Sequence, residues 1–218
     1  DSWEAPTSSS TPDDAAGHHE GYGNYYDTMG STWVHSLDQL QYSTHFKNLL
    51  GWIPDNQIHH TTGNFSGRIY ASDRTKIEGR HYGLRVDANR ALGSHHTATD
   101  LDYYIEYRSR YSGAGGVTDG GLIYLSDPEG TSGSTLLLDM VPGTESYGNP
   151  NNGAYTQSSH DHALQNGQSF TGTDNRWKIQ ITDKGGSGAN SYLDVTISDL
   201  NTPQITQHPQ DAMVTGGT

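Results

Sequence analysis

The sequence predicts a mostly β protein, in which an antiparallel β-sandwich follows a loop-rich segment with one helix. Three observations support this fold class. Only 31% of the 218 residues are hydrophobic, and Gly, Ser, Thr, Asn and Asp, which favour turns over helices, are abundant. Segments 177–182 and 193–198 alternate apolar and polar residues, as half-buried strands do. The 14 Tyr and 4 Trp supply large surfaces for a core, so the chain is expected to fold.

The first 60 residues contain the only helix that the sequence predicts. Residues 1–21 lack an apolar period and are expected to form a loop, and residues 21–30 a turn-rich segment. Asp38 is the expected N-cap of the helix, Gly51 its expected end, and Pro54 prevents it from resuming. Between these limits, apolar side chains recur at helical spacing at Leu40, Phe46, Leu49 and Leu50.

From about residue 64 the apolar period changes from 3.6 to 2, which indicates strands. Strands are expected over 65–71, 81–86, 103–108, 122–125, 136–140, 177–182 and 193–198. The last two flank the Gly-rich linker 184–188, so they are expected to pair as a hairpin. Together these strands predict a sandwich of about 130 residues.

Charge and composition exclude several classes of function. The formal net charge is −13, and a polyanion repels phosphate backbones, so we expect no nucleic-acid partner. The chain has no Cys, which excludes a disulfide framework, a thiolate metal site and a Cys nucleophile, and which fits a secreted bacterial protein. No apolar run reaches the roughly 18 residues of a membrane-spanning helix.

Three separated runs resemble gametolysin-type zinc metallopeptidases, and immune inhibitor A-type peptidases have a similar layout. Residues 22–30 (YGNYYDTMG) resemble the Met-turn region, with Asn24 where that family usually has Asp. Residues 45–53 (HFKNLLGWI) resemble the helix and turn that close the catalytic domain. Residues 103–108 (YYIEYR) and 136–143 (LLLDMVPG) resemble the β-domain that follows it.

The resemblance implies a metzincin-like enzyme, a secreted zinc endopeptidase that acts on protein or peptide substrates. In that class an H-E-x-x-H-x-x-G-x-x-H helix supplies three zinc ligands and a Glu general base. This chain contains no His-Glu-x-x-His, so the resemblance places the zinc ligands before Asp1 and leaves this piece inactive alone. The implied structural residues are Tyr22, Gly23, Asp27, Met29 and Gly30 of the Met-turn, and His45, Phe46, Gly51 and Trp52 of the closing helix and turn.

The same resemblance suggests three regions. Residues 1–62 would be the C-terminal part of a truncated α/β catalytic domain, and residues 63–200 the β-sandwich. Residues 201–218 would be a linker and the start of an immunoglobulin-like module, with further such modules expected in the same protein. Both ends of the chain are interpreted as cuts within a longer protein.

Other residues suggest metal sites, which remain alternatives. Most of the 12 His are expected in solvated loops, although His160 and His162 would share one face of a strand. The acidic turns 127–130 and 100–102 are candidate calcium sites, since calcium requires several oxygen ligands, but solvated turns are the preferred interpretation.

Two alternative functions also remain. Glu106 and Asp139 could form a glycosidase pair, although Glu106 is expected to point outward or to pair with Arg108 or Arg110. The sandwich could instead be a non-catalytic adhesion or carbohydrate-binding module of a surface protein. Tyr103 and Tyr147 are the candidate aromatic contacts in that case.

Overall fold

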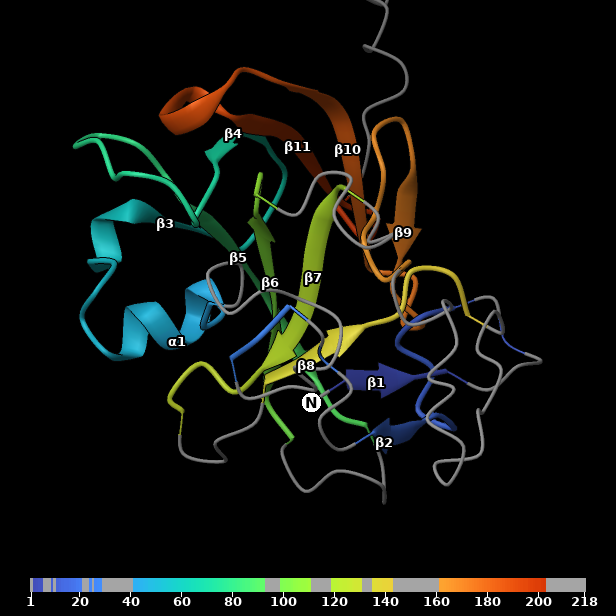
Figure 1. The fold of residues 1–218 in the computed structure, drawn as a ribbon. Helices are drawn as coiled ribbons and strands as arrows, with labels where there is room; N and C mark the ends of the chain where they lie inside the picture. Colours follow the sequence, from blue (N-terminus) through green and yellow to red (C-terminus); the bar gives the residue numbers. More distant parts are fainter. Residues whose placement is uncertain are drawn as a thin grey trace, which may run out of the picture.

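The computed structural model of the protein describes residues 2–5, 9, 11–20, 24, 26–28, 41–92, 99–110, 119–130, 135–142 and 161–202. These residues form two β-sheets, the α-helix α1 (Thr44–Leu49) and two short 3-10 turns, η2 (Asp55–Gln57) and η6 (Gly188–Asn190) (Figure 1). The protein is therefore mostly β, as the composition and the apolar period predict.

The larger sheet has seven strands in the described residues. Their order is β2-β1-β8-β7-β6-β5-β3. The bounds are β1 (Ser2–Glu4), β2 (His18–Glu20), β3 (Ile58–Thr61), β5 (Gly83–Arg90), β6 (Leu101–Tyr107), β7 (Gly121–Ser126) and β8 (Thr135–Leu138). Neighbours are antiparallel except for two pairs, β1 with β8 and β3 with β5. Both parallel pairs involve a strand from residues 1–62, whereas the described strand pairs within residues 63–200, where the sequence predicts an antiparallel sandwich, are antiparallel.

The smaller sheet contains β4 (Phe65–Tyr70), β11 (Tyr192–Asp199), β10 (Trp177–Gly185) and β9 (Ser169–Thr171), in that order and antiparallel throughout. β10 and β11 pair from Trp177 opposite Asp199 to Gly185 opposite Tyr192, which confirms the predicted hairpin. A register shift lies between Ile181 and Asp183.

The main core lies between the two sheets. From the smaller sheet it takes the alternating apolar positions of β10 and β11, all at most 1% exposed, as the sequence predicts: Trp177, Ile179, Ile181, Leu193, Val195 and Ile197. From the larger sheet it takes every second residue of β6, including Tyr103 and Ile105. Period-two alternation thus places one face of each strand against the other sheet.

The opposite face of the larger sheet is also covered. A second apolar cluster there contains Tyr104 of β6, Leu122 and Tyr124 of β7, and Leu137 of β8, joined by Tyr26 and Ala163 from outside the strands. The first residues of α1 lie against the same face, since Thr44 contacts β6 and the rings of His45 and Tyr104 lie 4.5 Å apart. Because both faces are covered, β6, β7 and β8 are buried along their whole length.

The N-terminal third differs from the sequence-based expectation in two ways. The helix begins at Thr44 after an N-cap at Ser43, while Asp38 lies outside the described residues. The hydroxyl of Ser43 accepts a hydrogen bond from the Phe46 amide, as a cap should. The expected loop 1–21 contains the strands β1 and β2, which form because β8 offers a free edge rather than because of any local alternation.

Strands on both sides of the predicted boundary at residue 62 belong to one sheet. β1, β2 and β3 come from the segment interpreted as catalytic domain, and β5 to β8 from the segment interpreted as sandwich. Residues 203–218, which include most of the expected immunoglobulin-like start, lie outside the described residues. No helix among the described residues is both long enough and apolar enough to span a membrane.

Candidate functional site

A buried ion pair lies where β6 meets α1. Glu106 of β6 is 1% exposed, and its Oε1 lies 2.7 Å from Nη2 of Arg108, which is 3% exposed. Oε1 also accepts a hydrogen bond of 2.8 Å from the Tyr124 hydroxyl, and Oε2 accepts one of 3.3 Å from the Ser72 hydroxyl. The predicted pairing with Arg108 is confirmed, whereas the expectation that Glu106 points outward is wrong because α1 covers this face.

The same carboxylate binds the start of α1. Oε2 of Glu106 accepts the Thr44 amide at 2.6 Å and the Thr44 hydroxyl at short range. Burial by itself raises the pKa of Glu106, but Arg108, Lys47 and the hydrogen bonds from Thr44 and Tyr124 together hold it below its ordinary value. Glu106 is therefore a buried anion whose two oxygens are both engaged.

The segment that resembles the Met-turn region contacts the same group. Arg108 donates from Nη1 to the Tyr26 carbonyl at short range, and the Ser43 amide donates to Oδ2 of Asp27 at 3.1 Å. Oδ1 of Asn24 accepts the Tyr26 amide at 3.0 Å. An Asp at position 24 could accept the same bond, so the departure from the family pattern preserves this contact.

Lys47 of α1 completes the group. It is 7% exposed, and its ammonium donates to the Ser72 carbonyl at 3.1 Å and to Oε1 of Gln41 at 2.6 Å. Burial is the main cause that lowers the pKa of Lys47 to about 7, and the neighbouring Arg108 lowers it further while Glu106 opposes the shift. Glu106 is thus paired with Arg108 and also interacts electrostatically with Lys47.

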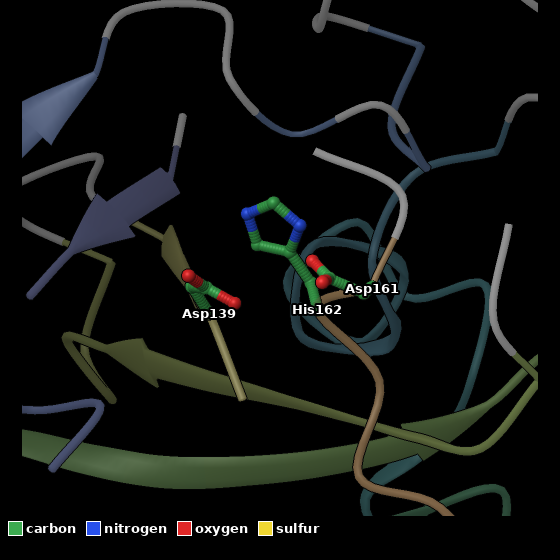
Figure 2. A group of neighbouring side chains, drawn as sticks. All are labelled: Asp139, Asp161 and His162. Atoms are coloured by element: carbon green, nitrogen blue, oxygen red, sulfur yellow. The ribbon is translucent and has the colours of Figure 1, made fainter. Parts of the chain in front are cut away.

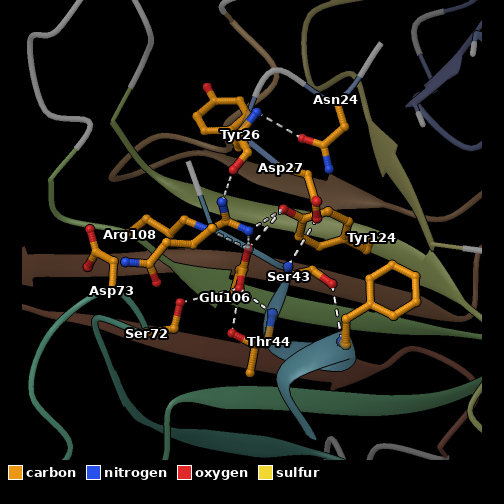
Figure 3. Close-up of polar contacts among 12 residues, drawn as sticks. Asn24, Tyr26, Asp27, Ser43, Thr44, Ser72, Asp73, Glu106, Arg108 and Tyr124 are labelled. Atoms are coloured by element: carbon orange, nitrogen blue, oxygen red, sulfur yellow. Dashed lines mark hydrogen bonds and ion pairs between the residues drawn. The ribbon is translucent and has the colours of Figure 1, made fainter. Parts of the chain in front are cut away.

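These residues form a single cluster, which we call the hub: Asn24, Tyr26, Asp27, Ser43, Thr44, Lys47, Ser72, Glu106, Arg108 and Tyr124. Figure 3 labels all of them except Lys47. The hub joins residues of the run 22–30 to Glu106 and Arg108 of the segment 103–108, about 80 residues away in sequence. Lys47 represents the run 45–53, and Ser43 and Thr44 lie directly before that run. Sequence reasoning identified Asp27 and the Glu106–Arg108 pair but missed the Ser and Thr members. The Ser43-Thr44 pair before an apolar helical run was the one signal for them, as a helix N-terminus.

The other residues predicted from the resemblance have varied surroundings. His45 is 2% exposed, and burial lowers its pKa to about 4. Phe46 is half-buried, and Gly51 ends α1 with a φ of +72°. Trp52 is 61% exposed and makes an edge contact with Tyr42, with ring centroids 5.7 Å apart. The predicted positions Tyr22, Gly23, Met29 and Gly30 lie outside the described residues.

A second polar cluster lies beyond the end of β8. It contains Asp139, Asp161 and His162, each of which places one potential ligand atom within 4.8 Å of the others (Figure 2). Asp139 is 1% exposed and His162 is fully buried, whereas Asp161 is partly exposed. The expectation of a solvated loop is therefore wrong for His162. The expected partner on its strand face, His160, lies outside the described residues.

Several other candidates have structural contacts instead. Asp102, one of the proposed calcium residues, accepts from Arg85 at 2.7 Å and from the Ala88 amide at 2.9 Å. Asp127 accepts the Glu129 amide at 2.9 Å, which closes its turn. Tyr103 is not a surface contact for a ligand, because it is fully buried and donates to Asp13 at 2.5 Å. Tyr147 lies outside the described residues.

The remaining candidates do not assemble into a catalytic pair. Glu106 belongs to the hub and Asp139 to the second cluster, so the carboxylates considered as a glycosidase pair have different partners. The ring of His59 lies against Phe65, with centroids 4.2 Å apart, and beside His81, at 5.2 Å. The adjacent His60 is exposed.

No protein-family model, characterised protein or solved structure matches this chain. The resemblance to gametolysin-type peptidases therefore rests on the residues of the three runs and on their arrangement.

Proposed function

We propose that this chain is the C-terminal part of a secreted zinc metalloendopeptidase that hydrolyses protein or peptide substrates. The supporting observation is the hub, in which Arg108 of the segment resembling the β-domain bonds Tyr26 of the segment resembling the Met-turn. Ser43 and Thr44, directly before the segment resembling the closing helix, bond Asp27 and Glu106. Such contacts are expected if these segments are adjoining parts of one catalytic unit.

In this proposal the residues of this chain position the active site, and the catalytic groups lie outside the chain. When bound by ligands outside this chain, zinc would supply a water molecule acidic enough to attack a peptide carbonyl. The residues of this chain would position the turn that lies beneath that site. Asp27 bonds the turn to the Ser43 amide, and Arg108 bonds the carbonyl of Tyr26. Glu106 lies in β6 of the larger sheet and Arg108 follows this strand directly, so this sheet holds both residues and, through Arg108, the turn.

The parent reading frame tests the proposal directly. We expect H-E-x-x-H-x-x-G-x-x-H to end within a few residues before Asp1. The purified parent protein is then expected to hydrolyse casein, to lose activity with 1,10-phenanthroline and to regain it with zinc. If the upstream frame instead encodes another β module, the non-catalytic adhesion or carbohydrate-binding function takes its place. If it encodes the same scaffold without the ligands, the protein is a degenerate relative without peptidase activity.

Two substitutions, Asp27→Ala and a control, test in the parent protein whether the hub positions the catalytic site. Asp27→Ala removes the link between the turn and Ser43, and we expect it to lower kcat by about ten- to a hundredfold with zinc content unchanged. Asp14→Ala, at an exposed turn carboxylate outside the hub, serves as the control and should leave kcat as it is. Equal kcat values for the two variants would show that the hub does not position the catalytic site.

A further inference from the structure

The cluster of Asp139, Asp161 and His162 combines groups from two segments that are separate in sequence. Asp139 comes directly after β8, and its Oδ1 accepts the Val141 amide at 2.8 Å, which orients the carboxylate. Asp161 and His162 come just before Leu164, whose amide and carbonyl both bond to Gly121 at the start of β7, each at 2.9 Å. Both segments are thus attached to neighbouring strands of the larger sheet.

The apolar core holds these two segments in place. Leu138, the residue before Asp139, is fully buried between the sheets. Ala163, the residue after His162, is fully buried in the cluster on the opposite face. The three polar side chains are therefore presented by backbone that cannot move far, which is the condition for a preformed site.

The chemistry of the three groups suits a metal ion. Two carboxylates within 4.8 Å of each other repel, and one of them is removed from water, so a cation between them relieves both effects. A neutral imidazole adds a nitrogen donor. Calcium and magnesium prefer oxygen alone, whereas zinc accepts His and Asp together.

The spacing of the groups also suits zinc. With bonds of about 2.0–2.2 Å, the ligand atoms around a tetrahedral zinc lie about 3.3 Å apart. The potential ligand atoms lie at most 4.8 Å apart, so side-chain rotations that move these atoms by about one to two ångströms bring them to zinc-binding distance. We propose that Asp139, Asp161 and His162 bind a divalent transition-metal ion, zinc in preference to calcium, which joins the end of β8 to the segment that leads into β9.

The site lies wholly within this chain, so its occupancy is measured independently of any peptidase activity. The tag-free chain is stripped with EDTA, equilibrated with zinc, desalted and analysed by mass spectrometry for metal content. We expect about one firmly held zinc ion per chain and a higher unfolding midpoint with zinc. Cobalt in place of zinc should give visible d–d absorption bands. Calcium should not raise the midpoint.

Four variants make the test specific. His162→Gln and Asp161→Asn should each lose the firmly held zinc ion and the zinc-dependent rise in the midpoint. His60→Gln and Asp183→Asn, at exposed positions elsewhere, should keep both. Because His162 is buried, the metal-free midpoint of each variant is measured first, and Asp161→Asn, at the partly exposed member, guards against misfolding.

The outcomes are distinct. Zinc held equally by all four variants would mean adventitious binding to surface histidines and would overturn the site. A wild-type chain that retains no zinc would show that the three groups form only a polar cluster without a metal ion and would overturn the proposal. A response to calcium and not to zinc would overturn the assignment of the metal.

Discussion

Lys47 is a buried basic side chain of the hub whose pKa is lowered strongly. Arg108 lies 2.7 Å from Glu106, so the carboxylate that favours a charged Lys47 already has a cationic partner, which repels that charge. Burial and this neighbour together lower its pKa to about 7, against 10.5 for an ordinary Lys. The charge of the hub therefore changes near neutral pH.

The first prediction is that Lys47 makes folding stability depend on pH in the alkaline range. Between about pH 7 and 10.5 the unfolded chain keeps the Lys47 proton and the folded chain does not, so stability rises with pH there. Below pH 7 both states are protonated, and the destabilisation is fully present. Lys47→Met should reduce the slope by about 1 kcal/mol per pH unit between about pH 8 and 9.

Urea unfolding at several pH values measures this slope. Lys178→Met, at a partly exposed position of β10, is the control and should leave the slope near that of the wild-type chain. The measurements stay below pH 10. Burial raises the pKa of Tyr104 to about 12, so above pH 10 the unfolded chain loses this proton first and the stability of the folded protein falls. An unchanged slope for Lys47→Met would mean that Lys47 stays charged in the folded protein.

At the scale of elements, the stability of α1 depends on the hydrogen bonds at its two ends. Six residues form too short a helix to persist by propensity alone. Its first turn is held by the cap at Ser43 and by Glu106, which accepts the Thr44 amide. Its last turn closes with the Gly51 amide bonded to the Asn48 carbonyl at 2.8 Å, in a left-handed conformation that Gly adopts without strain.

The second prediction concerns Gly51→Ala. No atom lies within 4 Å of an added Cβ there, so the whole effect comes from the φ of +72°, and we expect a loss of about 1 kcal/mol. Gly63→Ala is a matched control, because its added Cβ also meets open space and its φ is not in the left-handed range. Chemical denaturation of both variants gives the comparison. Equal stabilities would contradict the role of Gly51 as a conformational stop.

The sequence predicted some elements better than others, for physical reasons. β10 and β11 alternate because one face meets the core and the other meets solvent, so their pattern is local and readable. β1 and β3 have no such pattern, because they form by pairing with strands later in the sequence, β8 and β5, and β2 forms by pairing with β1. The helix end at Gly51 was predictable from one residue, whereas its start depends on Glu106, which is 62 residues away.

At the scale of the whole molecule, the hub connects parts that the chain keeps far apart. Glu106 bonds α1 through Thr44 and β7 through Tyr124. It also bonds Ser72, in the segment that follows β4. Arg108 carries the connection on to Tyr26. The candidate site was only partly predictable for this reason, since a charged pair two residues apart does not reveal which distant amides it will bind.

The third prediction is that the hub charge stabilises the whole fold. Glu106→Gln keeps the shape but leaves Arg108 buried without its counter-charge, so we expect a loss of about 3–5 kcal/mol. Asp194→Asn breaks the exposed pair with Arg68, at 2.7 Å, and should lose no more than about 1 kcal/mol. Guanidinium unfolding compares them. Losses of similar size would mean that the buried pair contributes no more than a surface pair.

The parallel pairing of β1 with β8 has a consequence for the order in which the protein folds. Ser2 lies opposite Leu137, so β1 can pair with β8 only after more than 130 later residues have been synthesised, whereas its other neighbour, β2, follows within 20 residues. β4 likewise waits for β11, with Phe65 opposite Ile197. Contacts so distant in sequence make folding slow, because a long loop must close before they form. During synthesis the hairpin of β10 and β11 can therefore form at once, whereas the pairing of β1 with β8 forms late.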